Sequence, residues 1–276
     1  MKTLKTGEFY GQTNQTLHLD FATITDTEYT HDRVGWHYHE NAYFTFILQG
    51  NVIEGNKKEV YTCTPGSLLF HNWQDPHYNI KPKGYTRGFQ IEINNNWLAQ
   101  ADIDIQNLQG SFSIDNPQVK LLFYRLFKES KANDDASIPA TEALLLQVLA
   151  GMDSSAVTGS RNRPDWVKQV KEAIADDLSH KFTLKELATT ANVHPAHLSR
   201  DFSKYFNTNL GEYIRAMRVE KALSLMHSGK LSLTEIAMQC GFADQSHFLR
   251  CFKTFNADKP SAYRAVLAGG STITHP

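Results

Sequence analysis

Apolar residues gather in short runs up to about residue 110, and polar, turn-forming residues separate the runs. Four of them read LHLDFATIT, YFTFILQGNVIE, GSLLFHNW and YTRGFQIEI. Runs this short, rich in β-branched and aromatic residues and bounded by Gly, Asn, Asp or Pro, are typical of strands. The pattern therefore predicts an all-β region with the strand spacing of a barrel or a sandwich.

The spacing of apolar residues changes at Asn116-Pro117, where VKLLFYRLFKES and then IPATEALLLQVLAGM place them at helical intervals. We expect two amphipathic helices, over about 117–130 and 138–152. The following stretch, DSSAVTGSRNRP, is polar and without periodicity, which predicts an interdomain linker at 153–164. The pattern after the linker is helical.

The helical part contains an internal repeat. Thr183-Leu-Lys-Glu-Leu-Ala matches Ser232-Leu-Thr-Glu-Ile-Ala, and both are capping boxes that begin a helix. His197-Leu-Ser-Arg-Asp-Phe matches His247-Phe-Leu-Arg-Cys-Phe at a spacing one residue longer, so the second copy has one more residue in its turn. Two helix-turn-helix units are predicted, over about 183–206 and 232–255, joined by a helix over about 211–228.

Each unit has a second helix with one apolar face, and the opposite face is free to enter a DNA groove. The apolar face carries Leu198 and Phe202 in the first unit, and Phe248 and Phe252 in the second. The free face carries Ala196, Ser199, Arg200 and Ser203 in the first unit, and Gln245, Ser246, Leu249, Arg250 and Lys253 in the second. Arginine can bind guanine O6 and N7 with two hydrogen bonds, and leucine can contact a thymine methyl. A helical bundle without a nucleic-acid role is the alternative interpretation of each unit taken alone.

Composition supports a folded protein, and the sequence has no Ser-His-Asp or Cys-His arrangement, phosphate loop or paired-carboxylate signature that would indicate an enzyme. The chain has 276 residues, of which 41% are hydrophobic, enough for two domains. Residues 1–160 carry 12 Lys and Arg against 18 Asp and Glu, and residues 161–276 carry 16 against 11, so the net charges are −6 and +5. The net positive charge of the second half is modest, but it favours binding to a polyanionic partner. We expect three reduced thiols at Cys63, Cys240 and Cys251, no membrane span, no signal peptide and a cytoplasmic location.

The segment from about Pro164 to Arg264 resembles the DNA-binding domain of the AraC/XylS family of transcription regulators. The matching string is I-A-x-x-x-G-F-x-D-x-S-x-F-x-R-x-F-K-x-x-x-x-x-x-P-x-x-Y-R, which runs here from Ile236 to Arg264. The resemblance implies base contacts from Ala196, Ser199, Arg200, Gln245, Ser246, Leu249 and Arg250, and phosphate contacts from Lys204 and Lys253. Some relatives have a large side chain at the position of Ala196 that reaches the bases. We therefore expect the first unit to make fewer direct contacts with bases. The connecting helix would let one chain read two successive major grooves, with Arg215, Arg218 and Lys221 either contacting DNA or simply solvated.

The N-terminal part more weakly resembles a cupin, a double-stranded β-barrel, through Trp36-His-Tyr-His-Glu, Leu48-Gln-Gly50, Thr64-Pro-Gly66 and Asp75-Pro-His77. His37 and His39 share one strand face, and His77 could approach from an opposite strand. Three imidazoles could bind Zn, Fe, Ni or Cu, but Tyr43 and Phe44 stand where metal-binding cupins have a glutamate. We therefore expect no metal and no cofactor, and a small-molecule effector instead. The pocket candidates are Trp36, His37, His39, Tyr43 and His77, with Tyr38, Trp73 and Tyr78 as further aromatic walls.

These patterns predict an α+β multidomain protein. It has a cupin-like sensor domain at 1–115, a helical packing or dimerisation segment at 116–152, the linker at 153–164 and a DNA-binding domain at 165–268. The favoured function is a sequence-specific transcription regulator that binds double-stranded DNA under effector control, as a homodimer and in contact with RNA polymerase. A metal-dependent cupin enzyme with a helical accessory domain is the alternative, and an interaction adaptor without DNA preference is a third possibility.

Overall fold

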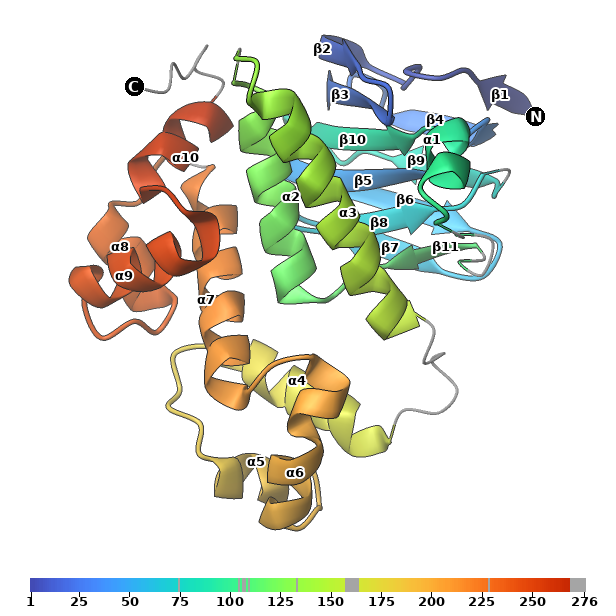
Figure 1. The fold of residues 1–276 in the computed structure, drawn as a ribbon. Coiled ribbons are helices and arrows are strands. Elements are labelled where there is room, and N and C mark those ends of the chain that lie inside the picture. The colour runs from blue at the N-terminus through green and yellow to red at the C-terminus, as the bar shows by residue number, and fades with distance from the viewer. Residues whose placement is uncertain are drawn as a thin grey trace. The chain divides into compact units, whose positions relative to one another are not determined.

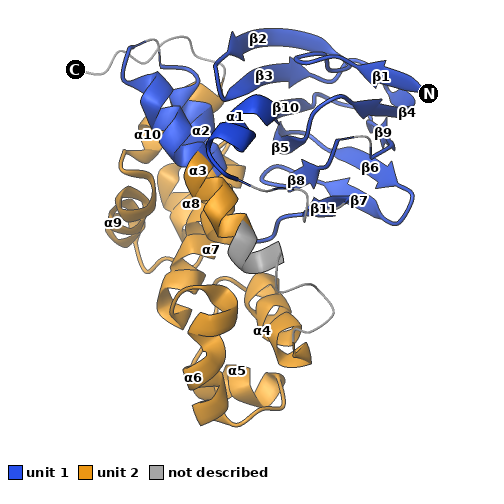
Figure 2. Ribbon diagram, turned by 45° about the vertical axis from the view of Figure 1, so that its right-hand side comes forward, with its two compact units in different colours: residues 1–116, 123–145, 270–276 blue, residues 117–122, 146–269 orange. Residues whose placement is uncertain are grey.

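The structure, a computed structural model, describes residues 1–73, 75–103, 105, 108, 110–132, 134–156, 164–227 and 229–268. The chain divides into a sheet-rich unit, which includes residues 1–116 and 123–145, and a helical unit that includes 117–122 and 146–268 (Figure 2). The predicted α+β class is confirmed. Among the described residues, no helix combines the length and the apolar character needed to cross a membrane.

The strands of the described residues form two sheets (Figure 1). The first has the order β1 (Lys2–Leu4), β4 (Arg33–His39), β9 (His77–Ile80), β6 (Val52–Asn56) and β7 (Val60–Cys63). The second has the order β11 (Ser111–Ser113), β8 (Leu68–His71), β5 (Tyr43–Gln49), β10 (Arg87–Ile93), β3 (Ala22–Glu28) and β2 (Gln12–His18). Neighbouring strands pair antiparallel except β1 and β4, which are parallel.

Helix α2 (Pro117–Glu129) packs against one face of the second sheet through aromatic rings. The ring centroids of Phe44 and Phe123 lie 5.1 Å apart, and those of Phe89 and Phe127 lie 5.2 Å apart. Side chains alternate across a strand, so Thr45, the residue after Phe44 on β5, points to the opposite face of the sheet. There it lines an interior cavity. One face of this sheet is therefore apolar core, and the other contributes to a site.

Two features of the helices, the end of α3 and the presence of α1, depart clearly from the prediction. α3 (Ser137–Ala156) continues four residues past the expected end at 152, so the start of the predicted linker is helical. Extending an existing helix costs little even through Asp and Ser, because each added residue brings one hydrogen bond. Residues 157–163 of the predicted linker lie outside the described residues. A short helix, α1 (Asn95–Gln100), begins at the Asn94 cap and was not predicted.

The helical unit contains both predicted helix-turn-helix units. Its helices are α4 (Asp165–Asp176), α5 (Leu184–Thr190), α6 (Pro195–Phe206), α7 (Leu210–Met226), α8 (Leu233–Gln239), α9 (Gln245–Asn256) and α10 (Pro260–Leu267). Thr183 and Ser232 form the two capping boxes, each with the glutamate three residues on. The turn between α8 and α9 is one residue longer than the turn between α5 and α6, as the repeat spacing predicts. The three cysteines are free and buried.

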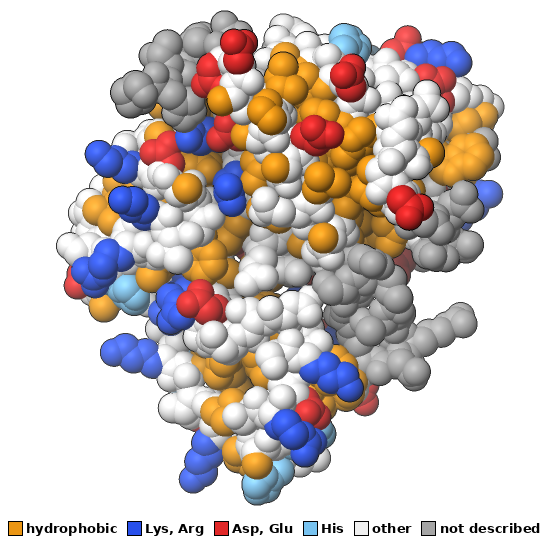
Figure 3. All heavy atoms as spheres, viewed as in Figure 1, with side chains coloured by type: hydrophobic (Ala, Val, Ile, Leu, Met, Phe, Trp, Pro, Cys, Tyr) orange, Lys and Arg blue, Asp and Glu red, His pale blue; other side chains and the backbone are white. Residues whose placement is uncertain are grey.

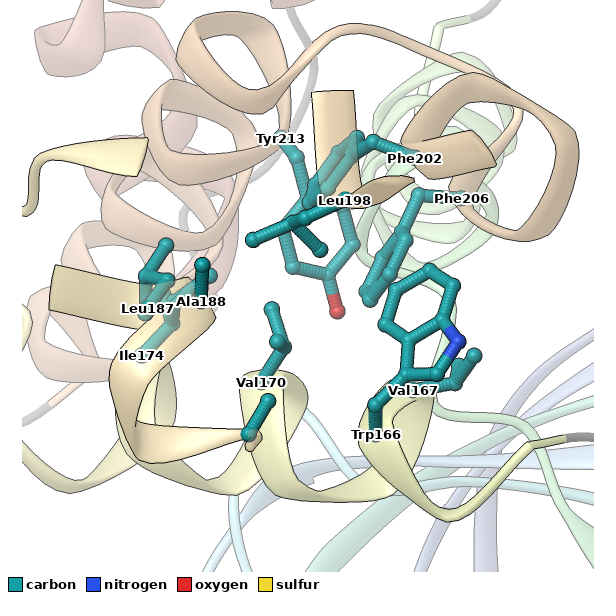
Figure 4. Packing of buried hydrophobic residues seen from close by; sticks show 11 residues of the cluster. Trp166, Val167, Val170, Ile174, Leu187, Ala188, Leu198, Phe202, Phe206 and Tyr213 are labelled. Carbon is teal, nitrogen blue, oxygen red and sulfur yellow. The ribbon is translucent and has the colours of Figure 1, made fainter. Parts of the chain in front are cut away.

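The first helix-turn-helix unit has its own apolar core, which α4 completes (Figure 4). Trp166 and Val170 of α4 pack against the buried face of α6, where Phe202 and Phe206 stack with ring centroids 4.1 Å apart. Tyr213, at the start of α7, packs on Phe206 with ring centroids 4.7 Å apart. The apolar face of α6 is therefore committed to the core, and its opposite face is left for a partner.

The second unit is joined to the first by direct backbone contacts as well as by α7. Gly241, in the turn between α8 and α9, has φ +77° and approaches the Leu178 carbonyl so closely that a Cβ atom would lie 2.3 Å from its oxygen. The same carbonyl accepts a 2.8 Å hydrogen bond from Nε of Arg218 on α7, and the His180 carbonyl accepts one of 3.0 Å from the same guanidinium. Arg218 is thus a structural residue of this junction.

Gly241→Ala is expected to destabilise the helical unit by about 2 to 4 kcal/mol, because it adds both left-handed backbone strain and a clash with a carbonyl. Thermal unfolding followed by circular dichroism measures the loss. Gly229→Ala is the matched control, since Gly229 has φ +63° but no atom near the position of a Cβ, and only the strain applies. Equal losses in both variants would contradict the close packing at Gly241.

Candidate DNA-binding surface and sensor cavity

The first candidate reading surface is the outer face of α6. Ala196, Ser199 and Arg200 are exposed there, as the repeat predicted. The side-chain oxygens of Asp201 accept hydrogen bonds of 2.9 and 3.3 Å from the Arg200 guanidinium, and Asp201 also lies 2.9 Å from Nε2 of His197. Arg200 must therefore leave a neighbouring acid before it can contact a base.

The second candidate reading surface is the outer face of α9. Ser246 and Arg250 are exposed, and Leu249 keeps 37% of its surface accessible. Gln245 is half-buried, and its side-chain oxygen accepts a 2.8 Å hydrogen bond from Oγ1 of Thr234. At the position that corresponds to Asp201, this copy has the buried Cys251. Within the described part of the chain, no acid pairs with Arg250, so this guanidinium is free to bind.

The two lysines predicted to contact phosphates, Lys204 and Lys253, are exposed and lie in the last turns of α6 and α9. Figure 3 shows further Lys and Arg side chains on the surface of the helical unit. On α7, Arg215 donates a 2.6 Å hydrogen bond to Glu212, and Lys221 is exposed. The surface that would face DNA therefore keeps its positive charge at the predicted positions.

The sensor cavity lies inside the sheet-rich unit, where three buried histidines meet. His37 and His39 lie on β4 and share one face, as predicted, and their side-chain nitrogens and that of His77 all lie within 4.8 Å of one another. The prediction that His77 approaches them is confirmed, but His77 comes from the neighbouring strand of the same sheet and not from an opposite strand. β9 is the antiparallel neighbour of β4, and His77 pairs directly with His37, with ring centroids 4.2 Å apart.

Hydrogen bonds determine which nitrogen of these rings carries the proton. Nδ1 of His37 lies 2.9 Å from the Gly35 carbonyl, and Nδ1 of His77 lies 3.3 Å from the Asp75 carbonyl. A carbonyl only accepts, so both Nδ1 atoms carry the proton and both Nε2 atoms keep a lone pair. The hydroxyl of Tyr43 donates to Nε2 of His77 at 3.0 Å. Nδ1 of His39 is buried without a hydrogen-bond partner.

Two polar residues of this region were missed by the sequence analysis. His71 on β8 stacks on Tyr43, with ring centroids 4.4 Å apart, and its Nε2 lies 3.0 Å from Oε1 of Glu54 on β6. Glu54 lines the cavity and accepts a 3.0 Å hydrogen bond from Asn79. The available signal was strand parity, because Glu54 shares the face of the buried Val52. A charged residue at such a position is rarely buried without a partner.

Burial determines the protonation of the cavity. It lowers the pKa of His77 to about 3 and the pKa values of His37, His39 and His71 below their ordinary range. It also raises the pKa of Glu54 to about 8. At neutral pH the imidazoles are therefore neutral, with lone pairs that can accept a proton donor or a cation.

Only some predicted pocket residues line the cavity. His37, His39, Tyr43 and His77 do, but Trp36 does not. It is 45% exposed and packs on Tyr78, with ring centroids 5.0 Å apart, because it alternates with His37 on β4. Trp73 is also exposed. The cavity has a volume of about 30 Å³, far below the roughly 300 to 1,000 Å³ of pockets that bind organic ligands.

Two known protein families match different parts of the chain. The "AraC-like ligand binding domain" family matches residues 18–149, and the "Helix-turn-helix domain" family matches residues 187–265. The chain is 23% identical over 245 residues to the HTH-type transcriptional activator RhaR of Mannheimia succiniciproducens, covering 83% of this chain and 86% of that one. It is 31% identical over 96 residues to the uncharacterized HTH-type transcriptional regulator YpdC of Escherichia coli, covering 35% and 34%. Unsaturated fatty acid-bound ToxT of Vibrio cholerae aligns with 16% identity and a TM-score of 0.39, covering 95% and 99%.

Proposed function

We propose, because this chain belongs to the AraC family of transcription regulators, that its two helix-turn-helix units bind successive major grooves of one DNA duplex. The chain has the N-terminal ligand-binding domain and the C-terminal DNA-binding domain of that family. We further propose that occupation of the N-terminal cavity by an effector changes the affinity for DNA. The residues assigned to base and phosphate contact remain part of this proposal.

The observation that carries the proposal is the duplicated exposed face. α6 and α9 each bury an aromatic face and expose small polar residues around one arginine, Arg200 or Arg250. The 17 residues of α7 between the two units form a rod about 25 Å long at about 1.5 Å per residue. A connector of this length suits two reading helices spaced by about 34 Å, one turn of DNA.

Selection of bound duplexes from a random pool, followed by affinity measurements over a range of salt concentrations, tests this proposal. We expect a selected sequence to bind in preference to unrelated DNA, with log affinity falling linearly as log salt rises. Lys204→Ala with Lys253→Ala is expected to weaken binding to every sequence and to reduce the salt slope by about 2. Absence of a preferred sequence would contradict the function, and an unchanged slope would contradict the assigned phosphate contacts.

A metal-dependent enzyme, the alternative function, is disfavoured by the size of the cavity. Pockets that bind organic ligands occupy roughly 300 to 1,000 Å³. The cavity beside His37, His39 and His77 has about 30 Å³, which leaves no room for an organic substrate next to a bound ion. We therefore propose that the chain regulates transcription without catalysing a reaction.

A second copy of the chain is the partner that we propose for α3. Ile138 and Leu146 are exposed on this helix, and hydrophobic side chains gather over it in Figure 3. Burial of that face in a homodimer would remove apolar surface from water, and analytical ultracentrifugation measures the oligomeric state. We also propose that the chain contacts RNA polymerase and is cytoplasmic. The name of the RhaR relative indicates transcriptional activation by that protein, and activation by this chain is likewise a proposal.

A further inference from the structure

We infer that His37, His39 and His77 bind one divalent first-row transition-metal ion, and that this ion is the effector that controls DNA binding. The effector role rests on the proposed function, but the ion site stands on the geometry of the cavity alone. Each residue offers one nitrogen, and all three are buried.

The three nitrogens are close enough to share one ion after a small movement. No side of their triangle exceeds 4.8 Å, so a point exists at most 4.8/√3, about 2.8 Å, from each nitrogen. Nitrogen from histidine binds zinc at about 2.0 to 2.1 Å. The rings therefore need to move inward by no more than about 0.7 Å, which side-chain rotation supplies.

The rings are already oriented as metal ligands usually are. A histidine that binds metal commonly donates its other N–H to a backbone carbonyl or a carboxylate, which fixes the tautomer. His37 and His77 both do so through Nδ1, to the carbonyls of Gly35 and Asp75. The third ring, His39, has a buried Nδ1 without a hydrogen-bond partner. An apolar core would not require two imidazoles fixed in the same tautomer beside a third with a buried, unpartnered nitrogen.

The size and lining of the cavity select an ion over an organic effector. About 30 Å³ accommodates an ion or a water molecule but not a sugar or an aromatic acid. Imidazole nitrogens suit Zn, Cu, Fe and Ni, whereas Mg and Ca require oxygen ligands. Glu54 lines the same cavity.

Tyr43 connects the ion site to the rest of the sensor domain. Its hydroxyl donates to the Nε2 lone pair of His77 that the ion would use, so ion binding must displace this hydrogen bond. The next residue on β5, Phe44, points to the opposite face of the sheet and packs on Phe123 of α2. A movement of Tyr43 would therefore shift the strand against which α2 packs.

Equilibrium dialysis of the metal-stripped full-length chain with Zn²⁺ and, separately, Co²⁺ tests the ion site. We expect one ion per chain, a higher melting temperature with Zn²⁺, and visible absorption from Co²⁺ bound by nitrogen. His37→Gln with His77→Gln is expected to lower the affinity at least 100-fold. His18→Gln is the control, because His18 is exposed and does not line the cavity. X-ray absorption of the parent chain with Zn²⁺ counts imidazole ligands directly, so the test stands even where the double variant does not fold.

The outcomes separate this inference from the proposed function. Absence of a bound ion, or binding that the double variant and X-ray absorption place elsewhere, overturns the ion site while DNA binding stands. Binding through these histidines with less than a twofold change in affinity for the selected duplex overturns the effector role. At least a tenfold change in that affinity, lost in the double variant but retained in His18→Gln, supports both. Failure to bind any duplex contradicts the proposed function and leaves the ion site intact.

Discussion

Replacing Arg200 and Arg250 together by alanine is expected to weaken binding to a selected duplex by about 1,000-fold, roughly 30-fold for each arginine that binds a base with two hydrogen bonds. Both side chains are exposed, so their loss should leave the melting temperature unchanged. Binding to unrelated DNA should fall much less, since the lysines that contact phosphates are retained. Fluorescence anisotropy with both duplexes measures the two affinities.

The two single variants should differ. Arg200 must break its hydrogen bonds with Asp201 before it can contact a base, whereas Arg250 has no such acid beside it among the described residues. Arg250→Ala should therefore cost more affinity than Arg200→Ala, and Asp201→Asn should strengthen binding by freeing Arg200.

Two controls show whether the arginines read bases. Lysine at both positions keeps the charge but loses the paired hydrogen bonds, so the preference for the selected sequence should fall with little change in salt dependence. Lys168→Ala, which removes an exposed charge of α4 outside both reading faces, should change little. Parental affinity in the Arg200→Ala, Arg250→Ala variant would show that the assigned face is wrong.

The helical unit could be predicted in detail because its sequence repeats. Thr183 and Ser232 begin their helices through local hydrogen bonds, and the buried residues Leu198 and Phe248 follow from helical periodicity. Local chemistry of this kind is readable from sequence. The structural role of Arg218 was not readable, because its partners are carbonyls 38 and 40 residues away.

The sensor domain could be predicted only in outline, because its cavity depends on which strands become neighbours. Strand parity placed His37 and His39 on one face, and it also places Trp36 on the opposite face, so the prediction of Trp36 as a pocket wall is wrong. The convergence of His71 and Glu54 on this region required the order of both sheets, which a single sequence does not show. The cavity volume depends on how those side chains fill the interior.

A buried charge cluster, outside the ion site, is expected to be the most sensitive point of the sensor domain. Asp26 on β3 is 2% exposed and accepts hydrogen bonds of 2.7 and 2.6 Å from Arg87 on β10 and another from Lys131, just after α2. Asp26→Ala leaves two cations with little exposure and without their shared counterion. We expect a loss of about 3 to 5 kcal/mol, or roughly 10 °C in melting temperature.

The pH dependence of stability provides an independent test of this cluster. Burial alone would raise the pKa of Asp26, but the hydrogen bonds and charges of Arg87 and Lys131 outweigh it and lower that pKa below its ordinary value of 3.8. Ionised Asp26 therefore stabilises the fold fully above its unfolded pKa, and this stabilisation is lost as the pH falls through the lower folded value. Thermal unfolding between pH 7 and 3 should show this loss in the parent chain but not in Asp26→Asn.

Asp32→Ala, at an exposed aspartate 3.5 Å from Lys81, is the control for Asp26→Ala and should lie within about 0.5 kcal/mol of the parent. Since Lys131 follows α2 directly, a parental melting temperature for Asp26→Ala would show that this cluster does not hold the end of that helix to the sheet.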